Sequence, residues 1–202
     1  MRPTFLLITA LLACTPQLAH ASCVQVMTYI QPYRISQSGM MGHSTSSGWV
    51  WTQDGAAMGS FGARVAATPE IPAMPSQTAG CSLLGHFRVR LHITDTTIAL
   101  PRSFAPGSCA YKAAVTHAIQ HYQAYRAALQ QSGPQLQAKL GLFLQRYAAG
   151  MAAENAATRP AAEAALEQLV QQHVAEFENE LQQANRQIEA QSDIRRALAA
   201  CP

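Results

Sequence analysis

Two histidines four residues apart are the feature of this 202-residue chain whose types and spacing could most clearly do chemistry. They are His117 and His121, in the run HAIQH. In a helix this spacing puts both imidazoles on one face, one turn apart, where both can ligate one metal ion. Zinc peptidases carry the same spacing as HExxH, and there the glutamate takes a proton from zinc-bound water. Ala118 stands at the glutamate position here, so the run predicts metal binding without that base.

A zinc site usually takes at least three ligands from the protein, and the histidine pair supplies only two. The C-terminal part of the chain offers candidates for the third. His173 comes first, because it falls on an apolar stripe of an expected helix, followed by Glu176 and then Glu154. Under the alternative interpretation His173 packs in the core and the histidine pair is incidental.

Long helices must position these residues. The Ala-, Gln- and Leu-rich sequence predicts helices over residues 109–130, 135–153 and 160–199, with Ser108 as the N-cap of the first. Residues 132–134, Ser-Gly-Pro, predict a stop or a kink. The last helix carries its apolar residues at spacings of three and four, which is typical of a packing face. This stripe consists of Leu166, Val170, His173, Phe177, Leu181, Ala184 and Ile188.

The preceding part of the chain, residues 22–105, is rich in Gly, Pro, Ser and Thr and predicts a small antiparallel sheet. The expected strands are residues 23–30, 48–52, 85–94 and 96–100. Asp95 is expected to turn the chain between the last two, and three prolines predict irregular structure over residues 66–80. The sequence therefore predicts a single α+β domain over residues 22–202, with a β-rich part followed by a helical part from residue 106.

The N-terminus has the character of an export signal. A positive start precedes a short apolar run, and Ala19 and Ala21 fit a signal-peptidase site, which makes residues 1–21 a signal peptide. We therefore expect a periplasmic or secreted protein. In the alternative interpretation, Leu-Leu-Ala before Cys14 is a lipobox and the protein is a lipoprotein anchored through Cys14.

Four cysteines follow the signal segment, an even number that indicates two disulfides in an exported protein. If the first and last helices run antiparallel, Cys109 at the start of one meets Cys201 at the end of the other. In this arrangement a disulfide between Cys23 and Cys81 joins two strands of the β-rich part. Pairing of Cys81 with Cys109 is the alternative.

A resemblance adds to this interpretation. Residues 97–101, then 106–111 with Cys-Ala-Tyr, then the histidine pair resemble a group of uncharacterised bacterial exported proteins identified as HExxH zinc peptidases. The similarity covers about residues 80–130, and Cys81 fits its layout. It implies a metallopeptidase fold and a zinc ion. Ala118 departs from the pattern, and loss of general acid–base help costs about two to four orders of magnitude in rate.

Three functions follow as expectations. The first is an exported, metallopeptidase-like protein without peptidase activity that binds a peptide or a cell-envelope partner. The second is an active zinc peptidase or hydrolase with a displaced base such as Glu176. The third is a structural envelope module with incidental histidines. A net charge of +3 without an arginine-rich patch argues against nucleic-acid binding, and no stretch after the signal is long and apolar enough to span a membrane.

Overall fold

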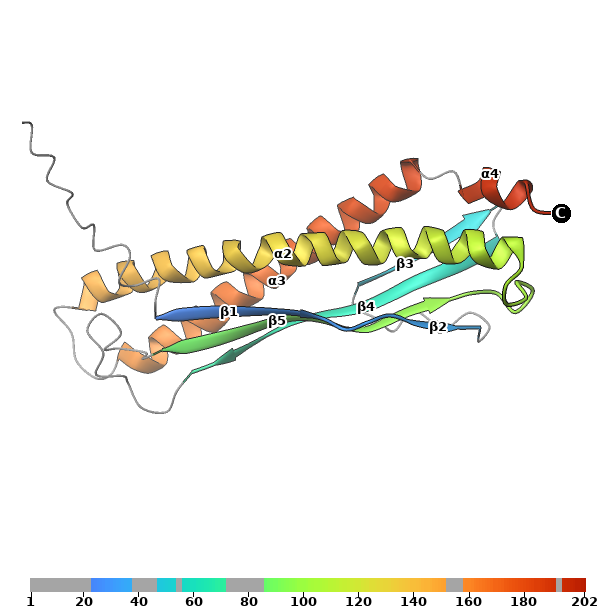
Figure 1. The fold of residues 1–202 in the computed structure, drawn as a ribbon. Coiled ribbons are helices and arrows are strands. Elements are labelled where there is room, and N and C mark those ends of the chain that lie inside the picture. Colours follow the sequence, from blue (N-terminus) through green and yellow to red (C-terminus); the bar gives the residue numbers. More distant parts are fainter. Residues whose placement is uncertain (1–22, 38–46, 54–55, 72–85, 152–157, 192–193) are drawn as a thin grey trace, which may run out of the picture.

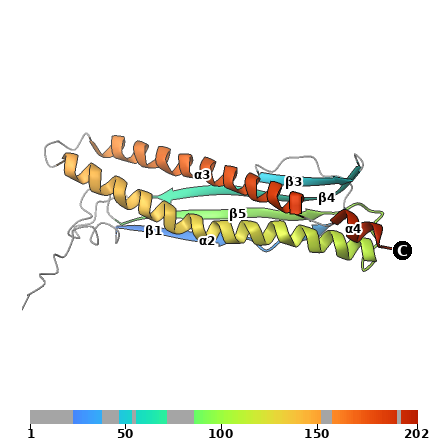
Figure 2. The ribbon, with the colours of Figure 1, turned by 90° about the horizontal axis from the view of Figure 1, so that it is seen from above.

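A computed structural model describes residues 23–37, 47–53, 56–71, 86–151, 158–191 and 194–202, and it confirms the α+β architecture (Figure 1). The elements in chain order are β1 (Val24–Ile30), β2 (Arg34–Ser36), β3 (Ser47–Gln53), β4 (Ala56–Glu70), β5 (Phe87–Ala99), α2 (Cys109–Met151), α3 (Thr158–Gln191) and α4 (Ile194–Ala199). The two long helices cover one face of the sheet, with α2 over β1 and α3 over β4 (Figure 2). Residues 1–21, Cys14, Cys81 and Glu154 lie outside the described residues.

The sheet is mixed, whereas the sequence predicted antiparallel pairing. Its order is β1-β5-β4-β3, and β2 also pairs with β5. β3, β4 and β5 form an antiparallel meander, but β1 and β2 run parallel to β5. The alternation of apolar and polar residues along a strand indicates which face of the sheet is buried. It does not indicate the direction of the neighbouring strand, so the sequence carried no local signal for the parallel pairing.

The predicted turn at Asp95 is wrong, because β5 continues through it as a bulge. Asp95 has a φ of 54°, a conformation that Asp tolerates better than most residues. The register with β4 shifts here, so that Asp95 and Thr96 lie opposite Ala63 alone. Gln31 bonds both sides of the bulge, since its Oε1 accepts from Asp95 N–H at 2.9 Å and its carbonyl from Thr96 Oγ1 at 2.7 Å.

The prediction of irregular structure over residues 66–80 is wrong for residues 66–70, which belong to β4, whereas residues 72–80 lie outside the described residues. β4 continues to Glu70, and Pro69 is in register with Val89 of β5. β3 pairs with β4 only as far as Ala63, and no other described strand pairs with the second half of β4 on that side. A proline, which has no N–H, is tolerated at such an edge.

The predicted break at Ser-Gly-Pro is also wrong, because α2 is one 43-residue helix with Pro134 inside it. An internal proline costs about 3 kcal/mol. Buried leucines lie on both sides of Pro134 in the core beneath α2: Leu129 before it, and Leu136 and Leu140 after it. Their packing stabilises α2 across the proline. Ser108 does cap its start, since Oγ accepts from Tyr111 N–H at 3.2 Å. The last predicted helix is divided into α3 and α4.

The core lies between the sheet and the two long helices. The alternation in β5 is confirmed, because Phe87, Val89, Leu91 and Ile93 are all buried. A disulfide joins Cys109 at the start of α2 to Cys201 after α4, with 5.5 Å between the Cα atoms. Cys23 is also disulfide-bonded. Within the described part of the chain, no helix combines the length and the apolar character that crossing a bilayer requires.

Candidate metal centre

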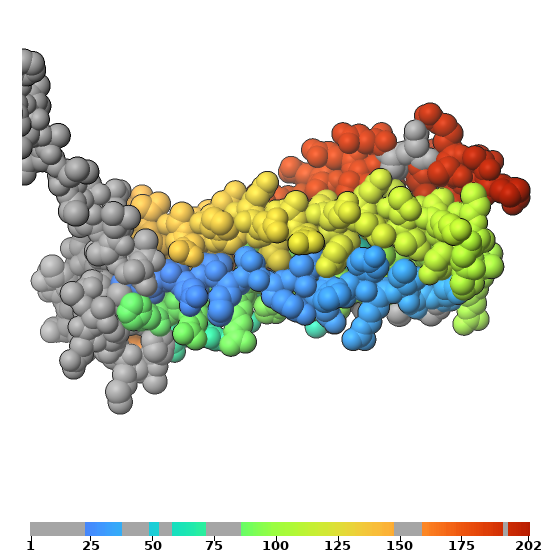
Figure 3. All heavy atoms as spheres, viewed as in Figure 1, coloured from blue at the N-terminus to red at the C-terminus, as the bar shows by residue number. Residues whose placement is uncertain are grey.

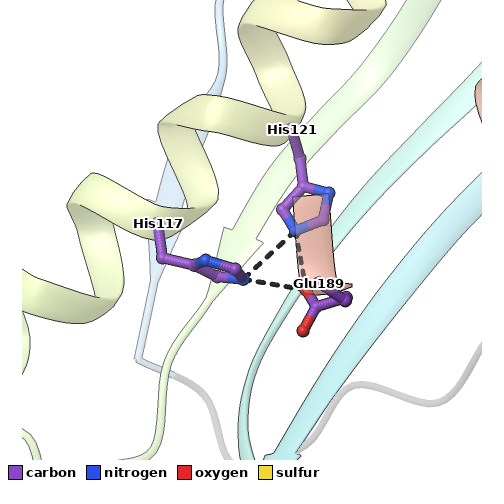
Figure 4. A group of neighbouring side chains, drawn as sticks. All are labelled: His117, His121 and Glu189. Carbon is purple, nitrogen blue, oxygen red and sulfur yellow. Dashed lines mark hydrogen bonds and ion pairs between the residues drawn. The ribbon is translucent and has the colours of Figure 1, made fainter. Parts of the chain in front are cut away.

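His117 and His121 on α2 converge with Glu189 on α3 (Figure 4). His117 Nε2 lies 2.9 Å from Glu189 Oε1, His121 Nε2 lies 3.1 Å from the same oxygen, and the two nitrogens are 3.2 Å apart. Glu189 follows the histidines by 72 and 68 residues, so only the packing of α3 against α2 brings the three together. They form the one group of three potential metal ligands found among the described residues.

The triangle formed by these atoms has the dimensions of a zinc site. Zinc binds imidazole nitrogen and carboxylate oxygen at about 2.0–2.1 Å in a tetrahedron, which puts neighbouring ligand atoms about 3.3 Å apart. The three separations, from 2.9 to 3.2 Å, need to expand by only a few tenths of an ångström. Two imidazoles and one carboxylate are also a ligand set that zinc enzymes use with a fourth position left open.

Aromatic rings enclose the histidines on the sheet side. Trp51 of β3 stacks on His121 with 5.8 Å between ring centroids, and meets His117 edge-on at 4.9 Å. Phe61 of β4 lies along the other side of His121 at 6.3 Å. Trp51 can approach this closely because Gly59 lies beneath it, where a Cβ atom would be 2.3 Å from the indole ring. His117 and His121 are therefore 3% and 0% exposed, in a water-poor environment.

Asn185 orients His121. Its Oδ1 lies 2.8 Å from His121 Nδ1, and its Nδ2 donates to the hydroxyl oxygen of Tyr125 at 2.9 Å. Since the amide nitrogen is used by Tyr125, Oδ1 is the acceptor for His121 Nδ1–H. In the neutral imidazole this leaves the lone pair on Nε2, directed at His117 and Glu189. Metal-binding histidines have the same arrangement, with the second nitrogen held by an outer hydrogen bond.

The charges in the group favour a cation at its centre. Burial raises the pKa of Glu189, but the hydrogen bonds from His117 and His121 and their positive charges outweigh it and lower the pKa to about 2. The carboxylate is therefore ionised at any physiological pH. When His121 gives up the proton that it shares with Glu189, its Nε2 lone pair lies 3.1 Å from Oε1, and a metal ion can take the place of that proton. His117 Nδ1 is buried without a hydrogen-bond partner among the described residues.

The other predicted ligands that the structure describes, His173 and Glu176, lie elsewhere on α3. His173 precedes Glu189 by sixteen residues, about 24 Å along a helix. Its Nε2 lies 2.7 Å from Ser132 Oγ, and its Nδ1 lies 3.3 Å from Lys139 Nζ. Lys139 also pairs with Glu176. These residues form a separate polar cluster half-way along the interface between the helices. A lysine donating to Nδ1 leaves Nε2–H as donor to Ser132, so His173 cannot act as a base for that hydroxyl.

Ala118 faces away from the ligand atoms. Its side chain is fully buried in the apolar core that also contains Ala114 and Tyr125. Gln120 is exposed to solvent. The group formed by the described residues contains one carboxylate, Glu189, and that carboxylate is itself a ligand.

Glu189 was missed because the apolar stripe was extended along the wrong positions. Beyond Leu181, the stripe predicted from the sequence continued to Ala184 and Ile188, both of which are only partly buried. Steps of four from Leu181 reach Asn185, which is fully buried, and then Glu189. The signal in the sequence was that these two polar residues, Asn185 and Glu189, continue the inward face of an amphipathic helix.

No protein-family model, curated protein or solved structure matches this chain. Its function therefore has to be inferred from the chemistry of its own side chains.

Proposed function

We propose that this protein is an exported zinc-binding protein with a metallopeptidase-like ligand set and no peptidase activity, in which the ion fastens α3 to α2. One observation carries the proposal. His117 Nε2, His121 Nε2 and Glu189 Oε1 meet within 3.2 Å of one another, with the outer hydrogen bond of His121 leaving its lone pair directed inward. Acceptor atoms buried in this arrangement are stabilised by a cation.

The absence of a base argues for binding without hydrolysis. A zinc ion held by these three residues would polarise a water molecule at its open position. Peptide hydrolysis also needs a group that removes a proton from that water and delivers it to the leaving amine. Ala118 cannot do this, and Glu189 cannot serve as ligand and base together.

A structural role for zinc follows from the position of the ligands. α2 supplies two of them and α3 the third, close to the end of α3 at Gln191. An ion that binds the folded chain and not the unfolded chain stabilises the fold by mass action. Zinc would therefore hold α3 to α2 at the end of the interface where the Cys109–Cys201 disulfide also joins the chain beyond α3 to the start of α2.

The disulfides support export. Cys109–Cys201 closes a loop across 92 residues of sequence, and Cys23 is also bonded. Such bonds persist in oxidising compartments such as the bacterial periplasm and are rare in the cytosol. The first 21 residues would be the signal that directs the chain there, and mass spectrometry of the mature N-terminus tests this directly.

Metal analysis of the purified protein tests zinc binding. After dialysis against buffered zinc, mass spectrometry of the metal should find one zinc per wild-type chain. His117→Ala and Glu189→Gln should retain far less. Glu167→Gln, on an exposed face of α3, and His92→Ala, on β5, are the matched controls and should keep the full content. Wild-type protein without stoichiometric zinc, or equal losses in the controls, would overturn the proposal.

A protease assay tests the second half of the proposal. Zinc-loaded wild-type protein should not cleave fluorescent casein. Cleavage at a rate that His121→Ala abolishes would show that this is an active enzyme with a displaced base.

A further inference from the structure

We propose that the groove between α2 and β1 binds an extended, uncharged segment of another polypeptide, which adds as a further strand to the outer edge of β1. This site is separate from the metal centre and does not depend on it. Among the described strands, β1 lies at the edge on this side of the sheet, and α2 lies directly beside it on the face seen in Figure 3.

The main chain of β1 presents hydrogen-bonding groups to the groove. The carbonyl of Cys23 accepts from Phe87 N–H at 3.0 Å, and Gln31 N–H donates to the carbonyl of Ile93 at 2.8 Å. The main-chain N–H and C=O groups of the odd-numbered residues of β1 therefore point toward β5. The N–H and C=O groups of the even-numbered residues 26, 28 and 30 consequently point outward, because neighbouring residues of a strand alternate.

One hydrogen bond within the described residues already uses this edge. Val26 N–H donates to Oε1 of Gln137, a side chain of α2, at a long 3.4 Å. The side-chain amide therefore occupies the position that a carbonyl of an added strand would take. A flexible glutamine can be displaced by such a carbonyl at little cost, because its amide can form hydrogen bonds elsewhere.

The wall of the groove on α2 is one helical stripe without a charged residue. Val26 and Thr28 form the β1 side, and the α2 side consists mostly of glutamines and small residues, among them Gln137, Ala138 and Gly141, together with Leu142. Leu142 is 49% exposed, a large apolar side chain left in contact with water. Glutamine amides can donate to and accept from a peptide main chain, and the small residues leave room for its side chains.

Pro134 adds an acceptor beside the groove. A helical residue normally donates its N–H to the carbonyl four positions earlier, and proline has no N–H. The carbonyl of Gln130 therefore has no helical partner at Pro134, and both residues line the groove. Pro134 therefore leaves one helix carbonyl at the wall of the groove without its usual donor four residues on.

These features select one kind of occupant. A strand edge that alternates donors and acceptors is complementary to an extended main chain, and addition of a strand beside a helix is an established mode of peptide recognition. The absence of charge in the lining favours uncharged side chains in the bound segment. β1 is seven residues long, so the segment that pairs with it is about four to six residues.

Gly141 gives a sharp test, because a Cβ at this position would meet nothing within 4 Å. Gly141→Arg therefore fills the groove with a charge and leaves the core intact. Thr28→Pro removes an outward N–H at an edge position where proline is tolerated. Gln123→Arg places the same charge on an exposed part of α2 away from the groove and is the matched control. Gly133 is unsuitable, since a Cβ there would be 2.6 Å from Thr28 Cγ2.

The probe is a phage-displayed library of random nine-residue peptides, selected on the disulfide-bonded wild-type protein. Enriched sequences should lack charged residues in a central block. Synthetic copies should bind wild type and Gln123→Arg equally by fluorescence polarisation, and Gly141→Arg and Thr28→Pro at least tenfold more weakly. Failure to enrich any sequence, or equal binding to all four proteins, would overturn the proposal. Self-association of wild type that Gly141→Arg abolishes in sedimentation velocity would assign the groove to a second copy instead.

Discussion

His121 and Asn185 are joined by a hydrogen bond of 2.8 Å between Nδ1 and Oδ1, and this bond determines which nitrogen of His121 faces Glu189. It connects α2 to α3 one helical turn from Glu189, the candidate ligand on α3. The Nδ2 group of the same amide donates to the hydroxyl oxygen of Tyr125, which fixes the amide in turn. The hydrogen bonds that orient the imidazole therefore come from both helices. The tautomer that binds a metal ion is thus set before any ion arrives.

Removal of this orientation should weaken zinc binding without abolishing it. We expect Asn185→Ala to lower zinc affinity by about 10–100-fold, the usual effect of losing an outer hydrogen bond to a metal-binding histidine. Competition with a chromophoric chelator measures the affinity. Asn179→Ala, on the exposed face of the same helix, is the matched control and should bind as wild type. Equal affinities for all three proteins would mean that Asn185 does not orient the ligand.

Placing a glutamate at position 118, as in HExxH, should destabilise the protein and not create a peptidase. The side chain of Ala118 is 0% exposed within the apolar core, so Ala118→Glu buries a carboxylate without a partner. The free energy of unfolding should fall by about 3 kcal/mol or more. Urea denaturation measures this, with Ala127→Glu at an exposed position of α2 as control. Normal stability together with zinc-dependent cleavage of casein would contradict the expectation.

Acidification should loosen the interface between the helices at His173. Burial lowers the pKa of His173 below its usual 6.5, and the positive charge of Lys139 adds to this, against the opposing effects of Ser132, Glu176 and Glu180. The pKa of His173 is therefore lower in the folded protein than in the unfolded chain. The stability that this difference contributes is complete above about pH 6.5 and is lost as the pH falls toward the folded pKa.

The measurement is the urea midpoint of the zinc-free protein from pH 7.5 to 5.0. Wild type should lose more stability over this range than His173→Gln, in which the group no longer titrates. The other histidines are common to both proteins, so the difference isolates His173. Identical slopes would show that His173 does not couple folding to pH.

Metal binding should be visible in the fluorescence of Trp51, because its ring lies 4.9 and 5.8 Å from the two histidine rings. Co²⁺ should quench the emission and saturate at one equivalent. The chain has two tryptophans, so Trp49→Phe isolates the signal. His117→Ala in that background should remove the quenching, and unchanged quenching would place the ion elsewhere.

Local patterns in the sequence predicted the features that depend on near neighbours. The alternation in β5, the capping by Ser108 and the two-part order of strands and helices are all of this kind. The shared helix face of His117 and His121 follows from their spacing alone.

Apart from the pairing of Cys109 with Cys201, the features that depend on distant parts of the chain were not predicted. Glu189 joins the site only through the packing of α3, the bulge at Asp95 arises where β5 changes partner from β1 to β2, and α2 passes Pro134 because its apolar residues are buried on both sides. In each case tertiary contacts outweighed a local preference.

The most direct test of the metal centre is a crystal structure of the zinc-loaded protein with anomalous diffraction measured at the zinc edge. We predict one ion bonded to His117 Nε2, His121 Nε2 and Glu189 Oε1 at about 2.0–2.2 Å. An ion bound to other residues, or no ion between the histidines and Glu189, would contradict the proposed function.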